Sequence, residues 1–132
     1  MSFVDMTFDD TFEYKSMPAG EHQLRVLDAE VKDQKPEKGT GSFIQLKFEV
    51  LGEDTAKDIY HVMMLPTPQD DKKKANNRKL AVIHLMKAIG AEVKSPFDPK
   101  EWIGNTGWAI LEEETDPEYG TRNRVRRFVV PA

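Results

Sequence analysis

The sequence of 132 residues contains no cysteine. This excludes disulfide bonds and thiolate metal ligands, and it suits a reducing compartment such as the cytoplasm. The sequence also lacks any apolar run near the roughly 20 residues that a membrane-spanning helix needs. The start of the chain, Met1–Asp5, has neither the basic residues nor the apolar stretch of a secretory signal peptide. We therefore expect a soluble cytoplasmic protein that makes no membrane contact.

Motifs for catalysis and for metal or cofactor binding are missing as well. Gly39 and Gly41 are not followed by the further glycine, the lysine and the helix that a phosphate-binding loop requires. The three histidines, His22, His61 and His84, are scattered along the chain. None has a serine or a carboxylate at the spacing of a catalytic or metal-binding motif. The sequence therefore predicts a protein that is not an enzyme and that holds no metal or cofactor.

Charged residues make up 32% of the chain, which carries a net charge of −4. A negative total argues mildly against a nucleic-acid partner, but a basic stripe can set the local field over a Debye length of roughly 10 Å. The charges are segregated along the chain. Acidic residues come early and late, and four arginines follow the late ones: Asp5, Asp9, Asp10, Glu13; Glu112–Glu114; Arg122, Arg124, Arg126, Arg127.

Residues 41–52 show the clearest strand pattern. Ile44, Leu46 and Phe48 alternate with mostly polar residues, which predicts one buried face and one outer face. Phe43 and Lys47 are four residues apart, so both project from the outer face. We interpret this segment as a central strand of an antiparallel sheet whose outer face is a candidate platform for nucleic acid.

Other segments complete a single mainly β domain spanning residues 1–132. In the first strand the apolar residues change face between Val26 and Leu27, which indicates a β-bulge. Residues 1–17 mix aromatic and acidic residues in an N-terminal arm, which is either an ordered terminal segment or an arm that competes with DNA for a basic groove. The remaining predicted elements are strands at 21–33, 58–65, 104–114 and 121–130, and a helix at 75–89.

The last strand carries the strongest chemical signal. A regular pleat places Arg122, Arg124 and Arg126 on one face, where they repel one another unless an anion covers them. Glu112 and Glu114 in the partner strand can neutralise them as a surface charge ladder. Nucleic-acid phosphates are the functional alternative, and the sequence leaves both open.

Aromatic and basic residues flank this strand in the predicted fold. Tyr119 lies at the hairpin tip before the arginines, where it is placed to stack an unpaired base. Tyr60 and His61 project to opposite faces of their strand, so one of them at most lies on the outer face. Lys35 and Lys38 lie in a glycine-containing loop, where they are either phosphate contacts or solvated side chains.

Several short motifs stand between residues 17 and 130, at Pro18–Glu21, Ile44–Val50, Leu80–Gly90, Trp102–Gly104 and Tyr119–Phe128. Together they resemble a family of small phage-encoded proteins, long described as of unknown function and regarded as single-stranded DNA-binding proteins with an OB-fold. The resemblance implies a five-stranded OB-fold-like barrel with one helix between strands 3 and 4. Such binders often end in an acidic tail that recruits partners, whereas this sequence ends at Pro131-Ala132. Any recruitment of partners would then fall to the acidic N-terminal arm.

We therefore expect sequence-tolerant binding of single-stranded DNA in phage replication or recombination, in the host cytoplasm, with replication or recombination proteins as further partners. The alternative is a protein-interaction or inhibitor module on the same barrel, which the negative net charge favours. In the first hypothesis the contacts to phosphate come from lysines and arginines and those to bases from aromatic rings: Lys35, Lys38, Lys47, Arg122, Arg124 and Arg126; Phe43, Tyr60 and Tyr119.

Overall fold

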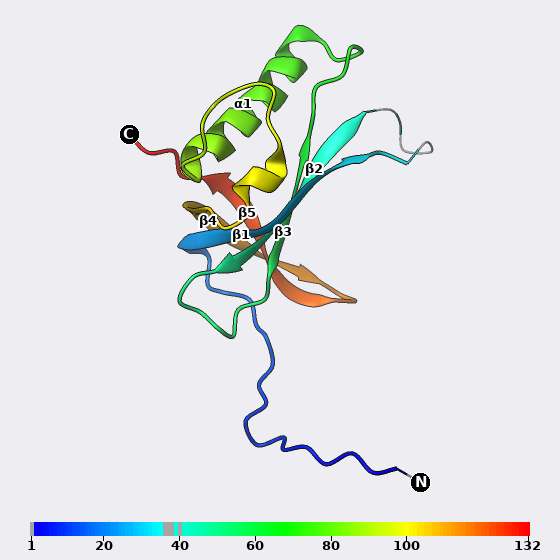
Figure 1. The fold of residues 1–132 in the computed structure, drawn as a ribbon, viewed down its shortest axis with the longest axis vertical. Coiled ribbons are helices and arrows are strands. Elements are labelled where there is room, and N and C mark those ends of the chain that lie inside the picture. Colours follow the sequence, from blue (N-terminus) through cyan, green and yellow to red (C-terminus); the bar gives the residue numbers. More distant parts are fainter. Residues whose placement is uncertain (1, 36–38, 40) are drawn as a thin grey trace.

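The described part of the chain forms five strands, one α-helix and one short 3₁₀ helix (Figure 1). It was obtained as a computed structural model, which describes residues 2–35, 39 and 41–132. All strand pairs are antiparallel, and the strands follow the order β3-β2-β1-β4-β5 in one sheet. The elements in chain order are β1 (Gly20–Asp33), β2 (Ser42–Val50), β3 (Ile59–Met64), α1 (Lys72–Ala88), η2 (Pro99–Trp102), β4 (Thr106–Asp116) and β5 (Gly120–Phe128).

The predicted mainly β domain with a helix between the third and fourth strands is confirmed. The predicted barrel is not formed by pairing, because no ladder joins the two edge strands β3 and β5 in the described part of the chain. These strands nevertheless approach each other at one end. The ring of Phe128 in β5 meets the ring of His61 in β3 edge-on, with the centroids 5.3 Å apart.

The long strand β1 bends in the middle, as its pattern predicts. Its register against β2 shifts between Val26 and Asp28, which leaves Leu27 as the extra residue of a bulge. Val26 and Ala29 on either side of the bulge are both buried. The first part of β1, from Gly20 to Arg25, pairs with β4, and the part from Leu24 to Asp33 pairs with β2.

Helix α1 covers one side of the sheet and begins earlier than the sequence pattern predicts. Its N-cap is Asp71, whose carboxylate accepts a hydrogen bond from the Lys74 backbone N–H at 2.7 Å. At its other end the helix packs directly on the sheet. A Cβ atom on Gly107 of β4 would overlap the carbonyl oxygen of Ala88, so the close contact requires glycine. The core between helix and sheet contains Val82, Leu85, Met86, Ile89, Ile44, Leu46 and Phe48.

The N-terminal arm extends away from the body of the protein (Figure 1). It joins the body where Lys15 forms an isolated parallel bridge with Ala56, between β2 and β3. Among the described residues, Met17 is the first in the chain that is buried. The side chain of Asn123 in β5 binds both the N–H and the carbonyl group of Met17. The Asn123 side chain accepts from the Met17 N–H at 2.6 Å and donates to the Met17 carbonyl at 2.8 Å.

Within the described residues, no helix combines the length and the apolar character needed to cross a membrane.

Candidate nucleic-acid interface

The outer face of β2 and β3 brings together several of the predicted contact residues. In the register of these strands Lys47 lies opposite Tyr60, and Phe43 lies opposite Met64 four pairs further along the ladder. Tyr60 is 60% exposed, so the outer face of β3 is the one that carries Tyr60 and not His61. This face, called the strip below, presents side chains of Phe43, Gln45 and Lys47 from β2 and of Tyr60, Val62 and Met64 from β3.

Lys47 is held in this strip by two neighbours. Its ammonium nitrogen lies 5.9 Å from the centroid of the Tyr60 ring and 3.5 Å from a carboxylate oxygen of Asp58. A cation over an aromatic ring gains a modest attraction at an exposed site. The ammonium group thus lies over the ring of a tyrosine that is 60% exposed.

A hollow of about 440 Å³ adjoins the Tyr60 end of the strip. Tyr60 enters it from β3, and Tyr119, which is 71% exposed, enters it from the β4–β5 turn. Two cations, Arg122 and Lys57, also line the hollow. The Lys57 ammonium group donates a hydrogen bond to the Thr121 carbonyl at 2.7 Å. The hollow is lined by Tyr14, Ala56, Lys57, Asp58, Tyr60, Tyr119 and Arg122.

The turn that carries Tyr119 is ordered by one carboxylate. Asp116 accepts hydrogen bonds from the backbone N–H groups of Glu118 and Tyr119, at 2.8 and 3.1 Å. These two bonds lower the pKa of Asp116 below its ordinary value, because they favour the charged form of the carboxylate. The charged Asp116 thus positions the backbone from which the Tyr119 ring projects.

Two of the β5 arginines lie against glutamates of β4, which is the charge ladder that the sequence left open. Arg122 lies 3.3 Å from Glu114, and Arg124 donates to Glu112 and lies 3.8 Å from Glu114. Both guanidinium groups remain more than half exposed. Of the two arginines, only Arg122 also lines the hollow beside Tyr60 and Tyr119.

Arg126 differs from the other two arginines. The β4–β5 register pairs Leu111 with Val125 and Ile110 with Arg127, so Arg126 is the extra residue of a bulge. It is exposed, and within the described residues it forms no ion pair. The bulge turns both Arg126 and Arg127 toward solvent at the end of β5.

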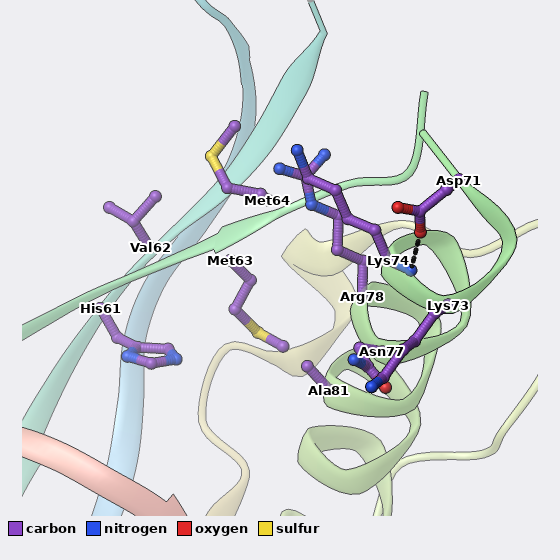
Figure 2. A pocket seen from close by; sticks show the side chains of 10 residues that line it. All are labelled: His61, Val62, Met63, Met64, Asp71, Lys73, Lys74, Asn77, Arg78 and Ala81. Carbon is purple, nitrogen blue, oxygen red and sulfur yellow. Dashed lines mark hydrogen bonds between the residues drawn. The ribbon is translucent and has the colours of Figure 1, made fainter. Parts of the chain in front are cut away.

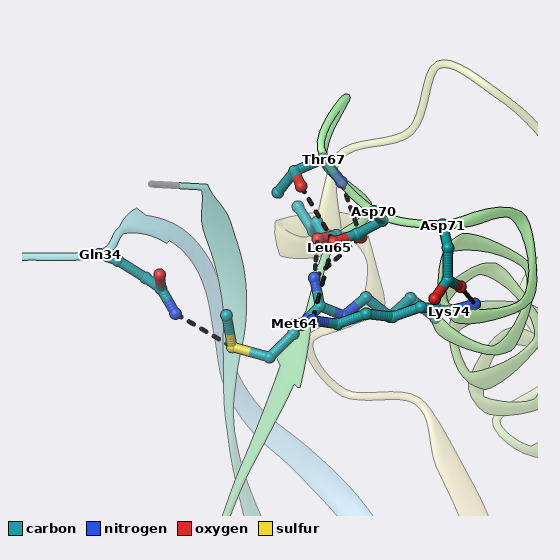
Figure 3. Close-up of polar contacts among 8 residues, drawn as sticks. Gln34, Met64, Leu65, Thr67, Asp70, Asp71 and Lys74 are labelled. Atoms are coloured by element: carbon teal, nitrogen blue, oxygen red, sulfur yellow. Dashed lines mark hydrogen bonds and ion pairs between the residues drawn. The ribbon is translucent and has the colours of Figure 1, made fainter. Parts of the chain in front are cut away.

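Lys35 lies toward the Phe43 end of the strip, because β1 pairs Lys32 with Phe43 and ends two residues before Lys35. Lys35 is exposed and follows Gln34, whose amide donates to the Met64 sulfur at 3.6 Å (Figure 3). Lys38 lies outside the described residues. The structure therefore groups Lys47, Tyr60, Tyr119 and Arg122 at one end of the strip, with Phe43 and Lys35 toward the other.

A second concavity, which sequence reasoning missed, lies between β3 and the start of α1 (Figure 2). This groove has a volume of about 560 Å³, and its residues come from elements that only the fold brings together. Burial lowers the pKa of His61 at its inner wall. The groove is lined by His61, Val62, Met63, Met64, Asp71, Lys73, Lys74, Asn77, Arg78 and Ala81.

Asp70 precedes α1 and binds Arg78, one of the residues that line this groove. Figure 3 shows Asp70 beside Thr67. The Asp70 side chain accepts from the Thr67 backbone N–H and hydroxyl, both at 3.0 Å, and from Arg78 at 2.9 Å. The Thr67 backbone bond makes the largest contribution to lowering the pKa of Asp70, and the Thr67 hydroxyl, Arg78 and Lys74 lower it further. Arg78 is thus held by an almost fully buried carboxylate.

Metal binding finds no support in the part of the chain that the structure describes, where no group of three His, Asp or Glu residues could hold an ion.

Comparison with known proteins identifies one family. The family model described as "Protein of unknown function (DUF669)" matches residues 4–110, which include β1 to β3, α1 and the first half of β4. No curated protein matches the chain.

Proposed function

The chain belongs to the DUF669 family, and we propose that it binds single-stranded DNA with little sequence preference. The binding surface in this proposal is the outer face of β2 and β3 together with the adjoining hollow. The observation that carries the proposal is the meeting of Tyr60 and Tyr119 in one hollow beside Arg122, from segments far apart in the sequence.

Two large exposed aromatic side chains in one small hollow favour a ligand with flat faces. Each base of an unpaired strand presents a π-face, and stacking on an aromatic side chain contributes about 1–3 kcal/mol per base. Arg122 and Lys57 in the same hollow are placed to meet the phosphates between stacked bases. Duplex DNA hides its base faces within the stack, so this surface favours single strands.

The arrangement of the elements supports an OB-type fold as part of the proposal. The strand order, the bulge in β1 and the helix between β3 and β4 agree with that fold, and the contact of Phe128 with His61 brings its two edge strands together. OB-folds bind oligonucleotides on the face of strands 2 and 3 and with the loops that join strands 1–2 and 4–5. Tyr60 and Tyr119 lie on such a face and such a loop.

Electrostatics make this a surface of moderate affinity. Lys47 and Arg122 each lie beside a carboxylate, Asp58 and Glu114, which a phosphate has to displace or share. Exposed ion pairs of this kind contribute only about 0–1 kcal/mol each, so the exchange is feasible. Exposed Lys35 and Arg126 extend the cationic surface, and the resemblance to phage single-strand binders favours a role in phage DNA replication or recombination.

Removal of the two rings tests the proposal. We expect Tyr60→Ala and Tyr119→Ala each to weaken binding of a fluorescently labelled oligo-dT about 5- to 100-fold, the equivalent of one lost stacking contact. The measurement is a fluorescence anisotropy titration. Both side chains are exposed, so the substitutions leave the fold intact.

The matched controls are Tyr60→Phe and Tyr119→Phe, which keep the ring and lose only the hydroxyl. We expect them to retain binding close to that of the wild type. Unchanged affinity in both alanine variants would overturn the proposed surface. Absence of any oligo-dT binding by the wild type would favour a protein-interaction module instead.

A further inference from the structure

The groove between β3 and α1 contains an unpaired strand edge. The Leu65 N–H donates to the Ser42 carbonyl of β2 at 3.0 Å, and the β2–β3 register continues this alternation along β3. Alternate residues of β3 therefore direct their backbone groups toward β2, and Tyr60, Val62 and Met64 direct theirs away from it. Within the described residues, no backbone hydrogen bond from another strand reaches Val62 or Met64.

The neighbouring strand β5 leaves this part of the edge open. β5 ends at Phe128, whose ring packs on His61, so Val62 and Met64 lie beyond the end of β5. Figure 2 shows Val62 and Met64 on one side of the strand and α1 across the groove from them. An exposed edge with unpaired backbone groups is a template for the addition of another strand.

The helix wall of the groove is cationic. Lys73 and Lys74 are exposed and line it, whereas Arg78 is engaged by Asp70 at 2.9 Å. Lys74 lies 3.9 Å from Asp70, and Lys73 forms no ion pair within the described residues. Asp71 also lines the groove, but its carboxylate is used as the helix N-cap. The strand added here is therefore expected to carry acidic and apolar side chains together.

The chain's own N-terminal arm has that composition in an extended form. Val4, Met6 and Phe8 alternate with polar and acidic residues, so a strand conformation places them on one face and Asp5, Thr7 and Asp9 on the other. The three apolar side chains are between 59% and 80% exposed. Exposed apolar groups in such a run mark an interaction site.

We propose that the N-terminal arm of one copy adds to the β3 edge of a second copy, with its apolar face on Val62 and Met64 and its carboxylates toward Lys73 and Lys74. The bridge of Lys15 with Ala56 anchors the arm at the β2–β3 connection, and from there it runs away from α1 (Figure 1). The arm is thus directed toward another molecule and not toward its own groove. The occupant is a second copy of this chain.

Charge reversal on each side of the contact tests the proposal. We expect the full-length protein to associate in a concentration-dependent manner without DNA, as measured by sedimentation velocity. We expect Lys73→Glu with Lys74→Glu, and separately Asp5→Lys with Asp9→Lys, to weaken this self-association at least tenfold. An equimolar mixture of the two variants should regain association, because the reversed arm then meets the reversed groove.

The matched control is Lys79→Glu with Lys87→Glu, the same charge change on the same helix at two exposed lysines that do not line the groove. It should leave association unchanged. A monomeric wild type at all concentrations, or equal association in every variant, would overturn the proposal. Because DNA is absent, the outcome is independent of whether the protein binds single strands.

An arm that folds back on its own body would also contradict the proposal, and the absence of cysteine allows a direct test. In a chain carrying both Met6→Cys and Val62→Cys, oxidation should yield disulfide-linked oligomers if the arm docks on a second copy. A disulfide-closed monomer as the main product would place the arm in its own groove.

Discussion

The cations that β2 and β5 contribute to the proposed interface differ in how firmly a carboxylate engages them. Lys47 lies beside Asp58, and Arg122 beside Glu114, in exposed pairs of small net stability. Arg124 is more firmly engaged, because Glu112 accepts from it and Glu114 lies nearby. Arg122 is therefore better placed than Arg124 to contact a phosphate.

Glu114→Gln tests this distinction between the arginines. The substitution removes the carboxylate nearest Arg122 and one negative charge beside the hollow. We expect oligo-dT affinity to rise about two- to fivefold at low salt, which corresponds to an exposed ion pair of up to about 1 kcal/mol. Glu101→Gln makes the same charge change on η2, outside the hollow, and should have no effect. Equal effects of both substitutions would mean that only net charge matters.

Single residues also show where sequence reasoning ends. The period of two along a strand predicts that Phe43 and Lys47 share a face. The pairing of Arg122 with Glu114 depends on the β4–β5 register, and a bulge at Arg126 changes that register within the strand. The sequence does not specify this register, so by itself it leaves the charge ladder and the phosphate site as alternatives.

Among the elements, β5 has a structural role besides its arginines. Asn123 lies between Arg122 and Arg124 and looks like a surface residue in the sequence, yet it is buried. Its amide satisfies the N–H and the carbonyl of Met17, and so attaches the N-terminal segment to the sheet. No sequence pattern indicated this, because the contact spans more than 100 positions of the chain.

Asn123→Ala should destabilise the protein by about 2–4 kcal/mol, because it leaves two buried backbone groups of Met17 without a partner. Urea unfolding followed by tryptophan fluorescence measures the loss. Asn76→Ala, the same change on the exposed surface of α1, should alter the free energy of unfolding by less than about 0.5 kcal/mol. A loss below that value for Asn123→Ala would show that the amide does not anchor the segment.

The sequence predicted the elements better than their connections. Alternating and helical patterns identified all five strands and the helix, because each element buries one face. The helix was predicted to start at residue 75, whereas capping by Asp71 lets α1 start at Lys72. The three lysines at the start of α1 carry no apolar pattern that could have indicated this turn. The groove beside β3 could not be predicted, since Val62 and Lys73 meet only after the helix packs on the sheet.

As a whole molecule, the protein combines a net charge of −4 with a local surface of cations and rings. Acidic residues also border this surface, because β1 pairs Asp28 with Lys47 and Glu30 with Gln45, and Asp58 lies 3.5 Å from Lys47. In the proposed mode of binding, the attraction for a DNA strand is therefore confined to the neighbourhood of the cations Lys47, Lys57 and Arg122. Counterion release at such a surface makes the affinity fall as salt rises.

The most direct test of single-strand binding is a titration of labelled oligo-dT and of a duplex of equal length at two salt concentrations. With about three phosphates neutralised, we predict that oligo-dT affinity falls about tenfold or more between about 50 mM and about 200 mM salt. The duplex should bind more weakly throughout. Affinity for oligo-dT that is absent at low salt, independent of salt, or equal to that for the duplex would contradict the account.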